Sequence, residues 1–207
     1  MTSSDSCLKI EPSGAERLQQ FINQFSLIER RHYIPLTDRK EDDASHTISV
    51  TLLAWYFYEK LSLNETLDLG KVLRYATVHD LVEAYAGDVP THASAAARQQ
   101  KVIDEENAMK RINSEFGHDF PGMTTAIVDY EKKADEEARF VWIVDKIQSY
   151  TQGYIDNWRP YHELPVTIDM FQETLAVQRT KCPEALLPFF DEMMRVYVPD
   201  FIKRYPK

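Results

Sequence analysis

The sequence has few cysteines, no long apolar run and a shortage of positive charge, and each shortage excludes a class of protein. Its two cysteines, Cys7 and Cys182, form neither a CxxC pair nor a disulfide framework. No segment approaches the run of about eighteen uncharged apolar residues that a membrane-spanning helix needs. The first residues lack the basic start and apolar core of a secretory signal. We therefore expect a reduced, cytoplasmic protein without a membrane span.

The balance of charge argues against a surface that binds a nucleic acid polymer. The 207 residues carry 33 acidic and 24 basic side chains, a formal net charge of -9. A DNA- or RNA-binding protein needs lysines and arginines clustered along the path of the backbone. An anionic small molecule can still bind where a metal ion and one or two arginines make a site locally positive. We expect a flexible N-terminal segment over residues 1–12 and a single domain over residues 13–207.

Helical periodicity dominates the chain, and alternating β-type segments are absent. Leu18, Phe21 and Phe25 recur at the spacing of one helix face. The polar, proline-containing segment 30–46 should be a loop. Further helices are expected at about residues 46–61, 93–116, 121–130, 134–150, 166–180 and 184–198. The helix that His46 opens is apolar on nearly all sides and should be central. With no internal repeat, the sequence predicts an all-α domain.

The densest group of chemically active side chains lies in the stretch VHDLVEAYAGDVP, residues 78–90. It holds an imidazole and three carboxylates: His79, Asp80, Glu83 and Asp88. The i, i+4 spacing of His79 and Glu83 places both on one face of a helix. Gly87 should end that helix, since glycine takes the left-handed conformation without a steric cost. The following turn then directs Asp88 back toward the same face.

Two more candidates lie outside this stretch. Asp145 directly follows the apolar run FVWIV, where a carboxylate costs several kcal/mol unless it is paired or bound to a cation. His46 stands at the start of its helix. Two imidazoles and two carboxylates form a mixed nitrogen and oxygen set that suits Mn²⁺, Co²⁺, Ni²⁺, Fe²⁺ or Mg²⁺. Open water positions on such an ion favour hydrolysis. The alternative is a core histidine with solvent-facing acids.

The order H…HD…D resembles the HD-domain metal-dependent phosphohydrolases, and within them most closely the YfbR-like 5′-deoxynucleotidases and their eukaryotic relatives. The resemblance runs from about residue 31 to residue 150. It is carried by RRHYIPLTDRKEDDASH, by HDLVEAYAGDVPT and by DYEKKADEEARFVWIVDKIQSY. The block HD-x-x-E-x-x-x-G-D is far more specific than a bare His-Asp pair. The resemblance implies a single-domain helical HD bundle and a homodimer.

The resemblance also implies roles for individual residues. One divalent metal ion would be bound by four side chains: His46, His79, Asp80 and Asp145. Glu83 and Asp88 would hold or deprotonate the attacking water, which suits carboxylates beside a metal. Arg31 would meet the substrate phosphate, because its planar fork matches phosphate oxygens. Arg39 and Lys40 lie in the same segment and are alternatives for that role.

Two departures from the family pattern affect these expectations. Ser45 stands where the family has an acidic residue just before the first histidine, so the support of His46 should differ. In the bacterial deoxynucleotidases an indole follows the phosphate arginine and helps to exclude the ribose 2′-hydroxyl; here the residue is His32. This change leaves the preference for deoxyribose open.

The leading hypothesis is a cytoplasmic, metal-dependent phosphoric monoester hydrolase that releases phosphate from nucleoside or deoxynucleoside 5′-monophosphates. The alternatives are a dNTP triphosphohydrolase, a phosphatase for another small phosphate ester, or a catalytically silent nucleotide-binding protein. The apolar C-terminal segment LLPFFDEMMRVYVPDF, residues 186–201, could supply a dimer interface or pack on its own core.

Overall fold

A computed structural model describes residues 12–88 and 95–205 of the chain. The segment 1–12, predicted to be flexible, lies outside the described residues except for its last position. Eight of the α-helices run in chain order as α1 (Pro12–Phe25), α2 (Asp43–Lys60), α3 (Leu69–Val78), α5 (Ala95–Phe116), α6 (Pro121–Lys132), α7 (Glu136–Ile155), α8 (Ile168–Lys181) and α9 (Leu187–Arg204). A short α4 (Glu83–Ala86) and three 3₁₀ turns (Leu63–Glu65, Arg159–His162, Glu184–Leu186) complete the helical part. The all-α prediction is confirmed.

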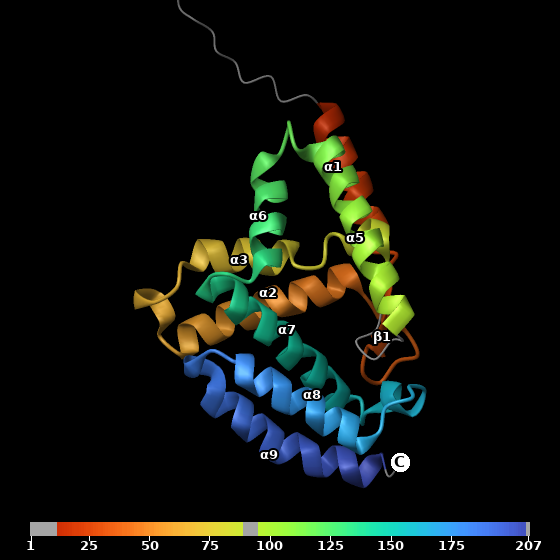
Figure 1. Ribbon diagram of the computed structural model, residues 1–207, viewed down its shortest axis with the longest axis vertical. Helices are drawn as coiled ribbons and strands as arrows, with labels where there is room; N and C mark the ends of the chain where they lie inside the picture. Colours follow the sequence, from red (N-terminus) through yellow and green to blue (C-terminus); the bar gives the residue numbers. More distant parts are fainter. Residues whose placement is uncertain (1–11, 89–94, 206–207) are drawn as a thin grey trace, which may run out of the picture.

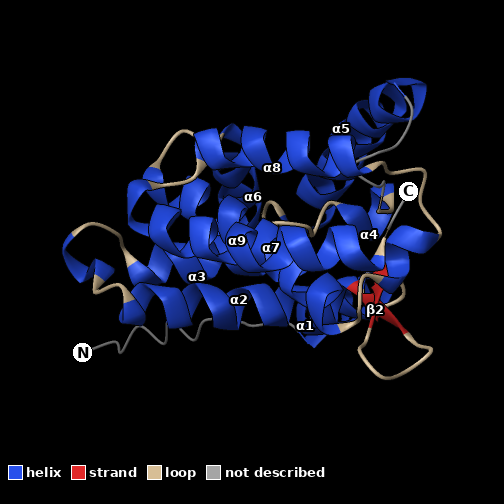
Figure 2. Cartoon of the chain, turned by 90° about the horizontal axis from the view of Figure 1, so that it is seen from below, coloured by secondary structure: helices blue, strands red, loops and turns tan. Residues whose placement is uncertain are grey.

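Helix α7 runs through the middle of the molecule (Figure 1). It packs against α2, α3 and α6 on one side and against α8 and α9 on the other. Its residues Val141, Ile143, Val144 and Ile147 are all at most 1% exposed, so apolar side chains cover several faces of this helix. Most of the run FVWIV therefore lies in the core, and the next residue, Asp145, is buried beside it. The view from below shows α7 behind the C-terminal helices (Figure 2).

The segment 30–46 contains a β-hairpin, so the predicted loop is wrong there. Strand β1 (Glu29–Tyr33) pairs antiparallel with β2 (Lys40–Asp42), with an irregularity in register between the ends of β1. Side chains alternate across a strand, and this hairpin follows that rule. Arg30 and His32 are partly buried toward the helices, whereas Arg31 is exposed. The hairpin thus determines which arginine enters the protein.

Helix α2 begins three residues before His46. The carboxylate of Asp42 caps it by accepting a hydrogen bond from the Ser45 N–H at 2.8 Å. His46 consequently lies in the first turn and is fully buried. The expectation of a helix buried all round holds only in part, because Ile48 and Leu52 are 62% and 59% exposed.

The stretch that carries His79 and Glu83 does not form one continuous helix, which corrects the sequence prediction. Helix α3 ends at Val78, and a turn with i to i+3 hydrogen bonds leads into α4. His79 Nδ1 donates to the Ala76 carbonyl at 2.8 Å, an acceptor that a continuing helix would offer to the Asp80 N–H. The end at Gly87 is confirmed, with φ of +78°.

The C-terminal segment packs on its own core. In α9, Phe190, Met193 and Phe201 are buried, and the rings of Phe201 and Phe171 of α8 stack at 3.9 Å. Helix α7 continues to Ile155, beyond the end expected near residue 150. A Cβ at Gly153 would come within 3.0 Å of the Trp158 ring, so this glycine permits close packing. No helix among the described residues is long and apolar enough to cross a membrane.

Candidate metal centre

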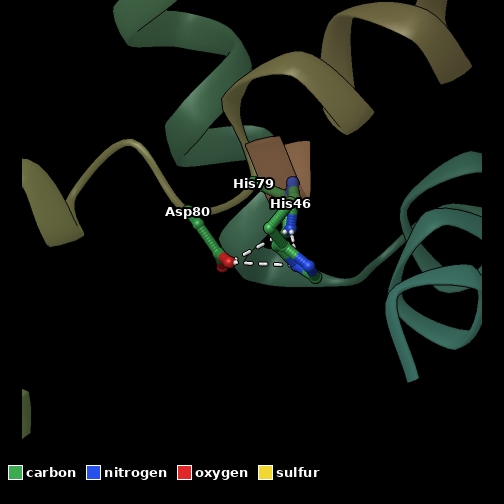
Figure 3. A group of neighbouring side chains, drawn as sticks. All are labelled: His46, His79 and Asp80. Atoms are coloured by element: carbon green, nitrogen blue, oxygen red, sulfur yellow. Dashed lines mark hydrogen bonds and ion pairs between the residues drawn. The ribbon is translucent and has the colours of Figure 1, made fainter. Parts of the chain in front are cut away.

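Side chains from two helices and one turn meet at a buried point. His46 comes from α2, His79 and Asp80 from the turn after α3, and Asp145 from α7 (Figure 3 shows the first three). The two imidazole Nε2 atoms lie 3.2 Å apart, and Asp145 Oδ1 lies 3.1 Å from the Nε2 of His46. Asp80 Oδ2 lies 3.2 Å from His79 Nε2 and 3.5 Å from His46 Nε2. The structure therefore brings all four sequence-predicted ligands together.

Hydrogen bonds on the far side of each ring orient the two imidazoles. His79 Nδ1 donates to the Ala76 carbonyl at 2.8 Å, and His46 Nδ1 donates to Gln148 Oε1 at 3.0 Å. Each ring then presents the lone pair of its Nε2 to the shared point, because a neutral imidazole carries one N–H. Two facing lone pairs and two carboxylate oxygens repel one another unless a cation lies between them.

The distances between these donor atoms fit an octahedral ion. Bonds of about 2.0–2.2 Å at right angles separate neighbouring donors by about 3 Å. The observed separations of 3.1, 3.2 and 3.5 Å lie at or slightly above that value. The absence of a thiolate among the four also suits a hard or borderline divalent ion. The residues thus fit a single divalent metal ion.

The electrostatics of the two carboxylates agree with this assignment. Burial alone would raise the pKa of Asp80, but His79 and Arg30 outweigh it and hold that pKa well below its ordinary value. Likewise the pKa of Asp145 is lowered despite burial, by Lys146 and His46. Lys146 Nζ lies 2.7 Å from Asp145 Oδ2. Both groups are therefore ionised at neutral pH, as metal ligands must be.

An open cavity reaches this point from the surface. Its lining includes Asp80, Asp145, Glu83 and Asp88, so both predicted water-handling carboxylates share the cavity with two of the metal ligands. Glu83 is 5% exposed, and Lys101 of α5 donates to its Oε1 at 3.2 Å. Burial, together with the charges of Asp80 and Asp88, raises the pKa of Glu83 to about 9.

The outer walls of the cavity are aromatic and polar. Tyr150 and Tyr161 line one part of it, and His32 faces Tyr161 with ring centroids 6.4 Å apart. Burial and the neighbouring Arg30 lower the pKa of His32 to about 4, so the ring is neutral. Thr174 and Gln178 of α8 add a hydroxyl and an amide. A ligand in which a planar ring and a polar group are attached to a phosphate would fit against these aromatic and polar side chains.

The two arginines of β1 point to different surroundings: Arg31 is exposed, and Arg30 is partly buried. Arg31, predicted to meet the substrate phosphate, is exposed and lines the cavity. Arg30, which the sequence analysis did not single out, lies 2.9 Å from Asp80 Oδ2 through its Nη1. The alternatives Arg39 and Lys40 are not among the residues that line the cavity. Recognition of the strand period of two would have separated Arg30 from Arg31.

Two further polar residues support His46. Gln148 accepts from His46 Nδ1 and donates through Nε2 to Glu41 Oε1 at 3.0 Å. Glu41 of β2 is 3% exposed, and burial raises its pKa to about 7. The sequence contained one signal for Gln148, because it lies three residues after Asp145 on the same helix face. Glu41 could not be paired with it before the hairpin was known.

Comparison with known proteins agrees with this geometry. The sequence model of the HD domain matches residues 22–185, which is most of the chain. The chain belongs to the HD-domain family. This HD domain contains all four residues of the donor cluster, the hairpin and the carboxylates that line the cavity.

Related proteins are distant in sequence. The 5′-deoxynucleotidase HDDC2 of Bos taurus is 26% identical over 158 residues, covering 74% of each chain. Its counterpart from Mus musculus is 25% identical over 143 residues, covering 68% of this chain and 69% of the relative. A predicted metal-dependent phosphohydrolase from Magnetospirillum magnetotacticum shares the fold, with a TM-score of 0.75 at 22% identity over 91% of this chain and 93% of its own.

Proposed function

We propose that the protein is a metal-dependent phosphohydrolase that releases phosphate from nucleoside or deoxynucleoside 5′-monophosphates. The observation that carries the proposal is the convergence of two imidazole Nε2 atoms and two carboxylates, with both carboxylates lining an open cavity. The names of the distant mammalian relatives, 5′-deoxynucleotidases, support the nucleotide substrate.

The proposed ligands of the divalent ion are His46, His79, Asp80 and Asp145. An ion held there supplies Lewis acidity, which activates water and neutralises charge on phosphoryl oxygens. The position of Glu83 suits a group that orients the attacking water and accepts its proton, because a divalent ion beside the carboxyl would lower its raised pKa. Asp88 lines the same cavity and would also hold that water.

The substrate phosphate would meet positive charge from the protein as well. Arg31 is exposed and lines the cavity, and Lys101 lines it from α5. An arginine fork bonds two phosphate oxygens at once, whereas a lysine acts as a point charge. We assign Arg31 to the phosphate of the bound substrate. The nucleoside would then lie against the outer walls, near His32 and Tyr161.

A phosphate-release assay tests the proposal. The protein is stripped of metal, resupplied with Mn²⁺, Co²⁺ or Mg²⁺, and given ribo- and deoxyribonucleoside mono- and triphosphates. We expect metal-dependent release of orthophosphate from monophosphates. Release of tripolyphosphate would instead identify a triphosphohydrolase, and turnover of other small esters alone would identify a different phosphatase. A protein that binds metal but hydrolyses none of these substrates would contradict the proposal.

The role of Arg31 has its own test. Arg31→Ala should raise the KM for a monophosphate, because the lost group binds the ground-state phosphate, while Arg39→Ala serves as the matched control. The Arg39 side chain is 67% exposed and is no part of the cavity wall. Unchanged KM and kcat in Arg31→Ala would withdraw the assignment. The predicted homodimer and cytoplasmic location stay predictions, and light scattering in solution would measure the former.

A further inference from the structure

Arg30 is surrounded by four carboxylates, of which three are buried and one, Asp80, is partly exposed. Its Nη1 lies 2.9 Å from Asp80 Oδ2, 3.1 Å from Asp43 Oδ1 and 4.0 Å from Glu83 Oε2, and its Nε lies 3.8 Å from Glu41 Oε2. A single nitrogen thus faces three carboxylates from the start of α2, the turn after α3 and the start of α4. Such a group of acids cannot remain buried and ionised without a cation.

Three of these carboxylates have the geometry of a metal site. Oxygen atoms of Asp43, Asp80 and Glu83 all lie within 4.8 Å of one another. Asp43 is fully buried and Glu83 is 5% exposed, and among the described residues neither Asp43 Oδ2 nor Glu83 Oε2 has a hydrogen-bond partner. Carboxylate oxygens with unused lone pairs are the ligands that hard divalent cations prefer.

This oxygen cluster shares one residue with the imidazole centre. Asp80 belongs both to the group with His46 and His79 and to the group with Asp43 and Glu83. Phosphohydrolases that use two ions commonly hold them about 3.5–4 Å apart around shared ligands. The ligand arrangement of this chain would therefore serve a second ion beside the first, if the space were free.

The Arg30 side chain fills that space. An ion bonded to these carboxylates at about 2.0–2.2 Å would overlap Nη1, which already lies at hydrogen-bond distance from Asp43 and Asp80. The guanidinium also cannot be neutralised by loss of a proton in a protein. We propose that Arg30 takes the place of a second divalent cation and keeps the centre mononuclear.

This assignment separates two kinds of positive charge in the site. The guanidinium balances Asp43 and orients Asp80 toward the imidazoles, but it has no open coordination position for water. Water can then be activated at one ion only. The inference rests on the divalent centre of the proposed function, and it is independent of the nucleotide substrate.

Counting bound metal tests the proposal. Protein stripped with a chelator is titrated with Mn²⁺, and bound manganese per chain is measured by elemental analysis and electron paramagnetic resonance. We expect one ion in the wild type and two in Arg30→Ala, with the spectrum of an exchange-coupled pair. Arg30→Lys keeps a cation in the cluster and should stay at one. Arg31→Ala, on the exposed side of the same strand, is the matched control and should also bind one.

A double variant locates the second ion. Arg30→Ala with Asp43→Ala should return to one ion, because the added substitution removes an oxygen ligand that only the second position uses. Arg30→Gln carries the same expectation as Arg30→Ala should the alanine variant fail to fold. Mn²⁺ should also raise the Tm of Arg30→Ala more than that of the wild type, since two ions bind the folded chain.

Three outcomes would overturn the inference. A second ion in the wild type shows that Arg30 does not exclude it, whatever the variants do. A folded Arg30→Ala that still binds one ion shows that the oxygen cluster is no metal position. No manganese in the wild type removes the divalent centre itself and the proposed function with it, so the two failures are distinguishable.

Discussion

The protein buries two regions equally well and fills them with opposite chemistry. In the aromatic cluster between α7, α8 and α9, Trp158, Phe171 and Phe201 are at most 1% exposed. Around the proposed metal centre, Asp43 and His46 are fully buried. Burying apolar rings stabilises the fold by about 25 cal/mol for each Å² removed from water. Burying charges costs free energy unless a partner offsets the loss of hydration.

The aromatic cluster therefore stabilises the fold, whereas the proposed metal centre carries the chemistry. The rings of the aromatic cluster meet edge to face or stacked, and the Trp158 N–H donates to Asp200 Oδ2 at 2.9 Å. The donor cluster needs cations, and Arg30 and Lys146 supply two of them. Helix α7 joins both regions, with Asp145 toward the donor cluster and Gly153 against Trp158. Substitutions in the two regions should therefore affect different properties.

The largest effect is expected from Asp80→Ala. This carboxylate lies within 3.5 Å of both imidazole Nε2 atoms and pairs with Arg30, so its loss removes a ligand and the partner of a buried cation. We expect bound Mn²⁺ to disappear and phosphate release to fall to the background rate, as measured by elemental analysis and the release assay. Retention of full activity in a metal-loaded variant would remove Asp80 from the ligand set.

Glu83→Gln should separate turnover from metal binding. The amide keeps the shape of the side chain but cannot accept a proton, so kcat should fall by about 10²–10⁴-fold, the usual contribution of a general acid or base. The bound ion should remain, because the four proposed ligands are unchanged. The comparison requires kcat and metal content from the same preparation. An unchanged kcat would exclude Glu83 from proton transfer.

Phe201→Ala tests the other side of the comparison. The ring is fully buried, stacks on Phe171 at 3.9 Å and meets Trp158 at 5.3 Å, so a cavity would replace it. We expect the free energy of unfolding to fall by about 3–5 kcal/mol. Denaturant unfolding measures the loss, and metal content of the folded variant should equal that of the wild type. Loss of metal from the folded variant would show that the two regions are coupled.

Phe189 offers a control in the same helix. Its ring packs on Phe57 at 4.8 Å but is 38% exposed, so Phe189→Ala should cost less than Phe201→Ala. Equal losses would mean that burial does not distinguish the two rings.

Much of this architecture could be predicted from the sequence, because it is encoded locally. Helical periodicity depends on residues three and four positions apart, and it gave the main helices within a few residues. The block that holds His79, Asp80 and Glu83 is also local, and the structure brings its first two members to His46 and Asp145. Burial of Asp145 followed from the apolar run before it.

What the sequence did not predict depends on long-range pairing. The hairpin joins β1 to β2 across a loop, and without it Arg30 and Arg31 are equivalent neighbours. Glu41 and Gln148 are 107 positions apart and meet only after α7 docks against the hairpin. The break after Val78 arises because His79 takes the Ala76 carbonyl for its side chain, a competition that periodicity does not register.

The smallest effect is expected at the start of α7, which both regions share. Asp135 caps this helix by accepting a hydrogen bond from the Ala138 N–H at 2.8 Å, and Asp135→Ala should lower the free energy of unfolding by about 1 kcal/mol. Partial burial raises the pKa of Asp135, but this hydrogen bond and Lys71 outweigh it, so the pKa is lowered. The stabilisation is therefore present at neutral pH and lost as the pH falls through the folded-state pKa.

The substitutions at Asp135 separate the cap from the charge. Asp135→Asn keeps a good capping residue and loses the ion pair with Lys71, which is partly exposed, so it should cost less than Asp135→Ala at pH 7. Asp68→Ala removes the equivalent cap of α3 and serves as the matched control. Thermal unfolding between pH 3 and pH 7 measures all three. A difference between the wild type and Asp135→Ala that grows in acid would contradict the lowered pKa, because protonation should abolish the charged part of the cap.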